Sequence, residues 1–138
     1  MDLAKALASG LAVNRALFGA SYLVQPKQAR TNWIGRAARK PGAQVMIRSQ
    51  GVRDIALGAG ALRAVLRGDP PELRAWMLAH TGSDLADLAV TWLAHDHLPT
   101  RRARLAMAIA GVSSLVGGAA AVSLRSTPTT SDPPVRSP

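Results

Sequence analysis

Four long apolar segments alternate with short polar connections along this chain. The apolar segments are residues 3–24, 43–66, 72–94 and 105–124. The breaks between them are rich in proline and glycine, most clearly at Gly68-Asp69-Pro70-Pro71, where a helix cannot continue. Each segment is long enough to cross a bilayer core of about 30 Å at about 1.5 Å per residue. The pattern predicts an all-α fold, a four-transmembrane-helix up-down bundle formed by residues 1–124 as one domain.

The last apolar segment carries the clearest membrane signal. Leu105 to Leu124 are 20 consecutive uncharged residues, the length of one bilayer crossing. From Arg125 the chain is rich in Ser, Thr and Pro, a composition typical of disorder. Residues 125–138 are therefore predicted to be a disordered polar tail.

Small residues recur every four positions in two of the segments, which places each set on one helical face. The first set is Ala8, Ala12, Ala16 and Ala20, and the second is Ala106, Ala110, Ser114 and Gly118. Such stripes let two helix backbones approach closely, as they do in membrane bundles. The composition agrees, because 48% of residues are apolar but only 4% are aromatic.

The net charge of +9 raises the question of a nucleic-acid partner. The excess lies in connections instead: residues 25–48 carry six basic residues and no acid, and residues 95–104 carry three arginines and one aspartate. These bases do not alternate with aromatic residues, so a nucleic-acid partner is not expected. By the positive-inside rule, loops 25–42 and 95–104 are predicted to be cytoplasmic, with both termini outside a bacterial inner membrane.

Charged residues inside the apolar segments are the main candidates for a site. Arg53 and Asp54 lie in the stretch Gly51–Gly60, and Arg15, Asp84 and Asp87 lie in the other segments. Counting residues from the segment ends places all of them about 10–15 Å from the cytoplasmic side. Two arginines and three aspartates at one depth can largely neutralise each other as ion pairs, with a net excess of one acid. His80 lies one helical turn from Asp84 and joins the predicted ionic layer.

Two interpretations of this layer remain open, and the structural one is favoured. The layer either fixes helix register in a structural or accessory protein, or forms a site for a small molecule or a proton. His80, Asp84 and Asp87 are poor candidates for metal ligands, since they offer one nitrogen beside arginines. His95 and His97, which flank Asp96, are interpreted as a solvated turn. The sequence predicts no catalytic residue, cofactor or metal.

Other hypotheses concern partners. A peripheral basic helical protein would bind anionic lipid through residues 27–48. An integral protein would contact the lipid bilayer and could bind a membrane-protein partner or a second copy of itself. The absence of cysteine excludes disulfides and thiolate chemistry.

The motif GVRDIALGAG at residues 51–60, followed by SDLADL at residues 83–88, resembles an uncharacterised family of small four-helix membrane proteins common in actinobacteria. The resemblance covers about residues 5–124 and implies a fold and a membrane location, but no activity. A looser architectural similarity links the chain to four-helix membrane proteins of the DoxX type.

Overall fold

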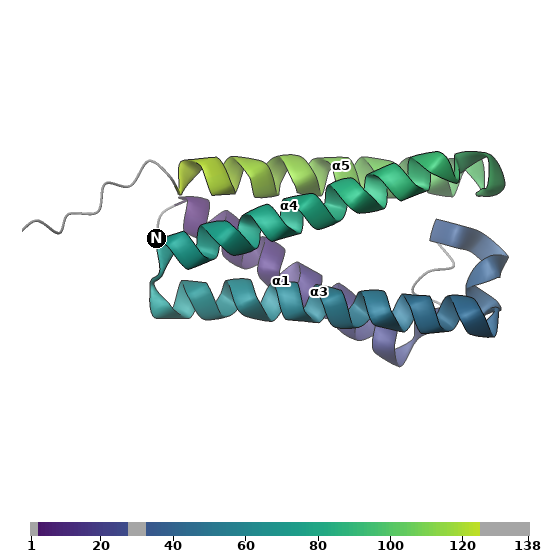
Figure 1. The fold of residues 1–138 in the computed structure, drawn as a ribbon, viewed down its shortest axis with the longest axis horizontal. Helices are drawn as coiled ribbons and strands as arrows, with labels where there is room; N and C mark the ends of the chain where they lie inside the picture. Colours follow the sequence, from purple (N-terminus) through teal and green to yellow (C-terminus); the bar gives the residue numbers. More distant parts are fainter. Residues whose placement is uncertain (1–2, 28–32, 125–138) are drawn as a thin grey trace, which may run out of the picture.

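The computed structural model describes residues 3–27 and 33–124, and these form an all-α bundle (Figure 1). The four long helices are α1 (Leu3–Val24), α3 (Pro41–Arg67), α4 (Pro70–Leu93) and α5 (Thr100–Ser123). Two short 3-10 helices, η1 (Gly35–Arg39) and η2 (His95–His97), lie in the connections. The predicted all-α fold with four helices is confirmed. The predicted disordered tail, residues 125–138, lies outside the described residues.

The turn between α3 and α4 shows how the sequence ends one helix and begins the next. Gly68 caps α3 in the left-handed conformation (φ 64°), which a residue with a side chain rarely adopts. The Asp69 side chain then accepts a hydrogen bond from the backbone N–H of Glu72 at 2.9 Å. Pro70 occupies the first turn of α4, where its missing N–H costs nothing.

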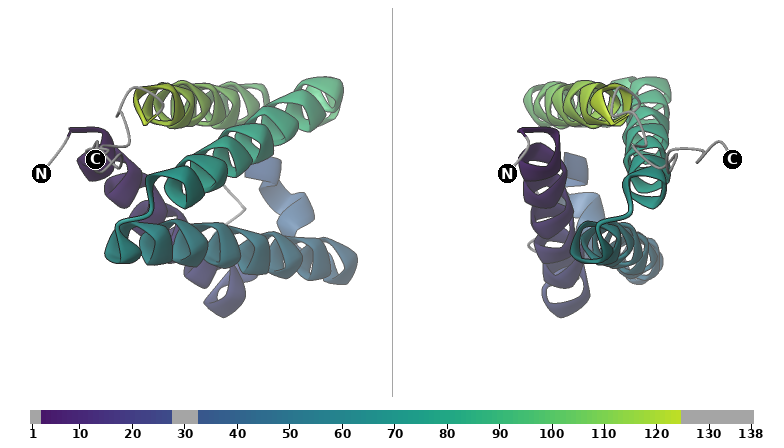
Figure 2. Two further views of the ribbon diagram at one scale, coloured as in Figure 1. Left: turned by 60° about the vertical axis from the view of Figure 1, so that its left-hand side comes forward. Right: turned by 90° about the vertical axis from the view of Figure 1, so that its left-hand side faces the viewer.

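The helices pack as two pairs, α1 on α3 and α4 on α5, which face each other (Figure 2). Glycines set the closest approach between α1 and α3. A Cβ atom on Gly51 would lie 2.7 Å from the backbone oxygen of Gly19, and one on Gly58 would lie 2.6 Å from that of Ala12. The backbones therefore touch directly along this interface, as in small-residue membrane packing.

The two predicted stripes of small residues are only partly the buried faces. Ala8 and Ala12 are fully buried against α3, but Ala20 is exposed and Gly19 takes the place predicted for it. In α5 the stripe is likewise buried only in its middle, at Ala110 and Ser114. The stripes leave the buried face because the helix has 3.6 residues per turn, so positions four residues apart rotate slowly around its axis.

An apolar core fills the end of the bundle at which α3 turns into α4. Its members are small except for three larger side chains, Leu73, Met77 and Leu124, which pack with alanines of α1, α3 and α5. Leu73 and Met77 are the largest fully buried side chains among the described residues. Only a thin interior is available for bulky side chains, because the helix axes approach closely.

The two basic connections meet at the opposite end of the bundle (Figure 1). Gly35, with a φ of 64°, lies so close to Pro99 that a Cβ atom would be 3.0 Å from the proline ring. Arg36, Arg39 and Arg101 are all exposed there. The excess positive charge of the chain is therefore concentrated at one end.

Two helices, Leu3–Val24 and Arg101–Ser123, are long and apolar enough to cross a membrane. Core helices of soluble proteins and signal sequences share this property. Among the described residues, α3 and α4 do not meet the same criterion, because charged residues interrupt them.

Replacing Gly58 by alanine should lower the free energy of unfolding by about 1–3 kcal/mol, because the new methyl group would overlap the α1 backbone. The matched control is Gly82→Ala in α4, where no atom lies within 4 Å of the new Cβ. That control should be neutral or stabilising by about 0.5–1 kcal/mol. Thermal unfolding followed by circular dichroism measures both, and equal effects would contradict the close α1–α3 contact.

Candidate functional site

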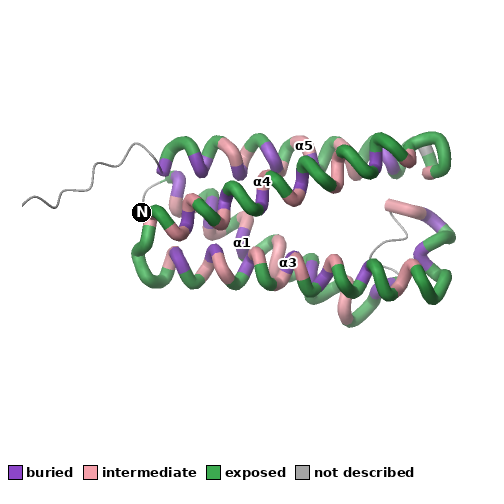
Figure 3. Tube along the Cα trace, viewed as in Figure 1, coloured by how far each residue is buried: buried purple, intermediate pink, exposed green. Residues whose placement is uncertain are grey.

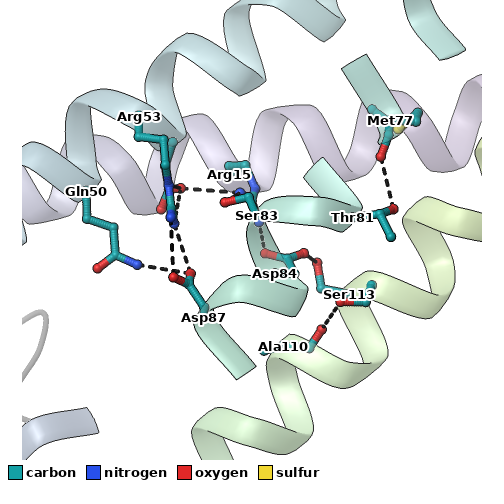
Figure 4. A network of polar contacts seen from close by, with 12 residues as sticks. Arg15, Gln50, Arg53, Met77, Thr81, Ser83, Asp84, Asp87, Ala110 and Ser113 are labelled. Carbon is teal, nitrogen blue, oxygen red and sulfur yellow. Dashed lines mark hydrogen bonds and ion pairs between the residues drawn. The ribbon is translucent and has the colours of Figure 1, made fainter. Parts of the chain in front are cut away.

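A polar network crosses the middle of the bundle (Figure 4). On α3 its position follows from helical spacing, since Gly51, Asp54 and Gly58 lie on one buried face. The glycines bring α1 close on either side of Asp54. The carboxylate is thus held against α1, at the level of Arg15.

Arg15 is the centre of the network. Its guanidinium lies 3.3 Å from Oδ1 of Asp54 and forms a second ion pair with Asp84. It also donates to the hydroxyl of Ser83 at 3.3 Å. The side chains of Arg15, Asp54 and Asp84 are each no more than 11% exposed. One cation from α1 therefore ties together α3 and α4, and removing a partner from such a buried pair costs about 3–5 kcal/mol.

Arg53 of α3 is the more exposed of the two arginines and extends the network to Asp87 of α4. It donates to both carboxylate oxygens of Asp87, at 3.3 and 2.9 Å, in the bidentate geometry that suits guanidinium and carboxylate. It also donates to Asp54 at 3.2 Å, so Asp54 is shared by both arginines. Gln50 donates to Asp87 at 3.0 Å. The structure therefore brings together the five charged residues of the predicted layer: Arg15, Arg53, Asp54, Asp84 and Asp87.

His80, the sixth predicted member, lies beside the network but outside its ion pairs. It is 3% exposed, on the same face of α4 as Asp84. Its Nε2 atom is buried and has no hydrogen-bond partner in the described part of the chain. An unpaired buried polar atom is costly, which makes this nitrogen a candidate position for a hydrogen bond to a ligand.

Ser113 on α5 also belongs to the network, although the sequence of α5 predicts only a face of small residues for helix packing. Its hydroxyl donates to Oδ2 of Asp84 at 2.5 Å (Figure 4). The neighbouring Ser114 donates instead to the Ala110 carbonyl of its own helix at 2.8 Å. Depth could have indicated Ser113, because it lies about 12 Å along the helix from Leu105, the same depth as the charges.

A cavity of about 660 Å³ lies against this network, between α1 and α5. Asp54, His80, Asp84 and Asp87 line its inner side, together with Arg15. Its volume falls within the range of about 300–1,000 Å³ typical of small-molecule sites. The two helix pairs thus leave a ligand-sized space between them, beside the charged groups.

The other walls of the cavity are apolar and aromatic. Large apolar side chains come from α1 and α5: Leu11, Phe18, Leu105, Ile109, Val112 and Val116. Tyr22 and Trp33 add two further rings. Phe18, Leu105 and Ile109 are each more than half exposed, so the cavity opens to the outside of the bundle between α1 and α5.

Residues 12–124 match the family described as "Domain of unknown function (DUF4267)". The chain belongs to this family. The resemblance to an uncharacterised family is thereby confirmed, whereas the actinobacterial source and the DoxX similarity stay predictions. No curated protein and no solved structure is significantly similar to the chain.

The match to this family begins at Ala12 and ends at Leu124, so it contains the whole polar network and all of the core except Ala4 and Ala8. It also contains the histidine turn, where His95 and Asp96 pair at 3.1 Å and both side chains are exposed. In residues 3–27 and 33–124, no group of three His, Cys, Asp or Glu side chains has a metal-binding arrangement.

Adjacent serines provide a test of the network. Replacing Ser113 by alanine removes a hydrogen bond to a buried carboxylate and should lower the free energy of unfolding by about 1–3 kcal/mol. Ser114→Ala is the matched control and should cost less than about 0.5 kcal/mol, because that hydroxyl bonds only within its helix. Chemical denaturation of both variants measures the difference, and a reversed order would show that α5 does not hold Asp84.

Proposed function

We propose that this protein is an integral membrane protein whose four helices all cross the bilayer and whose interhelical cavity binds a small molecule. The observation that carries the proposal is the distribution of polarity. Figure 3 shows that buried and exposed positions alternate along each long helix. Charged side chains meet at buried positions, and large apolar side chains occupy many of the exposed ones.

The exterior of α4 shows this distribution most clearly. Between Pro71 and Leu93, every exposed residue of the helix is Ala, Gly, Pro or a large apolar residue. The largest of these are Leu78, Leu85, Val90, Trp92 and Leu93. A monomer in water rarely exposes an apolar surface that runs the length of a helix. Lipid is the environment in which such a surface is stable.

The inward direction of the charges explains why α3 and α4 are less apolar in sequence than membrane helices usually are. Asp54 on α3 and Asp84 on α4 are at most 7% exposed. Arg53 is the most exposed member, and its guanidinium is bonded to Asp54 and Asp87. Ionisable groups in membrane helices face the bundle interior and pair in this way. Composition alone therefore understates how well α3 and α4 suit a bilayer.

The cavity favours ligand binding over a purely structural role for the network. If the ion pairs served only to fix helix register, the helices could close around them. Instead, the network borders a space of about 660 Å³, and His80, which is one of its lining residues, has an unpaired buried nitrogen. The structural alternative, in an accessory subunit or a homo-oligomer, draws its support from the ion pairs that join α1, α3 and α4.

The proposed orientation follows from the basic end of the bundle. Loops 25–42 and 95–104 would lie in the cytoplasm, and both termini outside, because positive residues are retained on the cytoplasmic side. The contact between Gly35 and Pro99 supports a common side for the two loops. An inner bacterial membrane is the proposed location. A peripheral protein attached by residues 27–48 is less favoured, because it would leave the apolar exterior in water.

Alkaline carbonate extraction tests the membrane location. Membranes from cells that express the full chain should keep the protein in the pellet, since its apolar exterior is embedded in lipid rather than held by charge. A peripheral protein bound by basic loops would be released, as would a control that is attached only electrostatically. Recovery of the chain in the supernatant would overturn the proposal.

Single introduced cysteines test the orientation, because the chain contains no cysteine of its own that could be labelled. A membrane-impermeant maleimide applied to spheroplasts should label Arg67→Cys, which lies at the end of α3 opposite the basic loops. Arg36→Cys and His97→Cys should be labelled only after the membrane is permeabilised. Labelling of the loop variants in intact spheroplasts would show that the orientation is reversed.

A further inference from the structure

The acids and bases on the cavity wall do not balance. Three aspartates and one arginine, Arg15, are among the described residues that line it. Arg53 lies behind them and pairs with Asp54 and Asp87. Even with both arginines counted, three carboxylates face two guanidinium groups. An uncompensated negative charge in a low-dielectric interior is costly, so one further positive charge would stabilise the layer.

The aromatic residues gather at the same cavity. Phe18, Tyr22 and Trp33 line it, although the whole chain has only five aromatic residues. Phe18 and Tyr22 lie on successive turns of α1 with ring centroids 6.4 Å apart, tilted at 50°. Aromatic faces attract cations through their ring quadrupole, and they do so more strongly where water is excluded. The aromatic rings and the excess carboxylates therefore both favour a positively charged ligand.

His80 supplies a hydrogen-bonding atom of the right kind. Its buried Nε2 has no partner in the described chain, and in the neutral ring one nitrogen accepts a hydrogen bond. Asp84 adds acceptor capacity, since a carboxylate has about four lone-pair sites. A protonated amine placed at this wall would donate to both. A quaternary ammonium group would leave Nε2 unpaired.

The rest of the cavity requires an apolar ligand body. Its walls from α1 and α5 are large aliphatic side chains, and it opens between these helices, where the exterior is apolar. The exposed basic side chains of the loops, such as Arg36 and Arg101, are not among its described lining residues. An anion would face three carboxylates there, so the basic end of the bundle does not make this cavity an anion site.

We infer that the cavity binds a lipophilic amine in its protonated form, with the ammonium group at Asp84 and His80 and the apolar body between α1 and α5. The ammonium supplies the charge that the two arginines leave missing. Phe18 contacts the bound cation on the open side. This assignment rests on the proposed ligand-binding function and specifies its ligand class.

Three ligands of one shape separate the contribution of charge to affinity from that of apolar contact: adamantyl amine, adamantyl carboxylate and adamantyl alcohol. Equilibrium dialysis against the purified full chain in neutral detergent, corrected with protein-free micelles, gives each affinity. The amine should bind saturably, one per chain. Its affinity should exceed that of the carboxylate by at least about 10-fold, because like charges at one site cost several kcal/mol. The alcohol should bind more weakly than the amine.

Variants locate the bound amine. Phe18→Leu should weaken amine binding by about two- to five-fold, the loss expected for one partly exposed cation–π contact. Trp92→Leu, an exposed aromatic outside the cavity, is the matched control and should leave the affinity unchanged. Asp84→Asn should weaken binding of the amine but not of the alcohol. If Asp84→Asn does not fold, the probe series on the native chain and Phe18→Leu still decide the result.

Each contrary outcome has a distinct meaning. Equal or tighter binding of the carboxylate overturns the cation assignment but keeps a ligand-binding cavity. Equal binding of amine and alcohol also overturns it and indicates that a proton neutralises the layer. If no probe binds saturably, both the ligand class and the ligand-binding part of the proposed function are wrong. The membrane location is judged separately, by carbonate extraction.

Discussion

The ion pairs of the Arg15 guanidinium are the interactions on which the bundle depends. Coming from α1, this guanidinium pairs with Asp54 of α3 and Asp84 of α4, and Asp84 in turn accepts a hydrogen bond from Ser113 of α5. All four helices are thus linked through one buried cation and its partner Asp84. In a medium of low dielectric such a pair has no solvent to replace a lost partner, so its members fix the register of the helices that carry them.

Glycine makes this arrangement possible. Gly51 and Gly58 bring α1 to backbone contact on both sides of Asp54, which shortens the distance that the Arg15 side chain must span. The same close packing leaves little interior volume, and the core therefore relies on alanine with a few larger residues at one end. Bulk that a soluble core would bury lies on the exterior instead. An apolar exterior, a thin core and an ionic centre are consequences of one packing style.

The cavity results from the way in which the two helix pairs meet. The α1–α3 and α4–α5 contacts are close, whereas α1 and α5 diverge toward the basic end and leave the space beside Asp84. A polar inner wall and an apolar opening follow directly. In the proposed site, the polar groups would orient a ligand and the apolar walls would supply contact area, which is the usual division of roles in small-molecule sites. The proposed binding site therefore shares residues with the network that joins the helices, and a variant at Asp84 must be measured for both stability and binding.

The sequence by itself determined the all-α class, the four helices and the charged residues that meet, because these follow from apolar segment length, from proline and glycine breaks, and from depth counted along a helix. Arg15, Asp54 and Asp84 could be matched in this way, since a rise of about 1.5 Å per residue converts sequence position into depth. Rotation about each helix axis is not encoded so simply. Only the tertiary structure decided that Gly19 rather than Ala20 faces α3, that Ser113 rather than Ser114 reaches Asp84, and that α1 and α5 leave a cavity. Each of these depends on how helices cross and twist against one another, which is set by contacts between segments far apart in the chain.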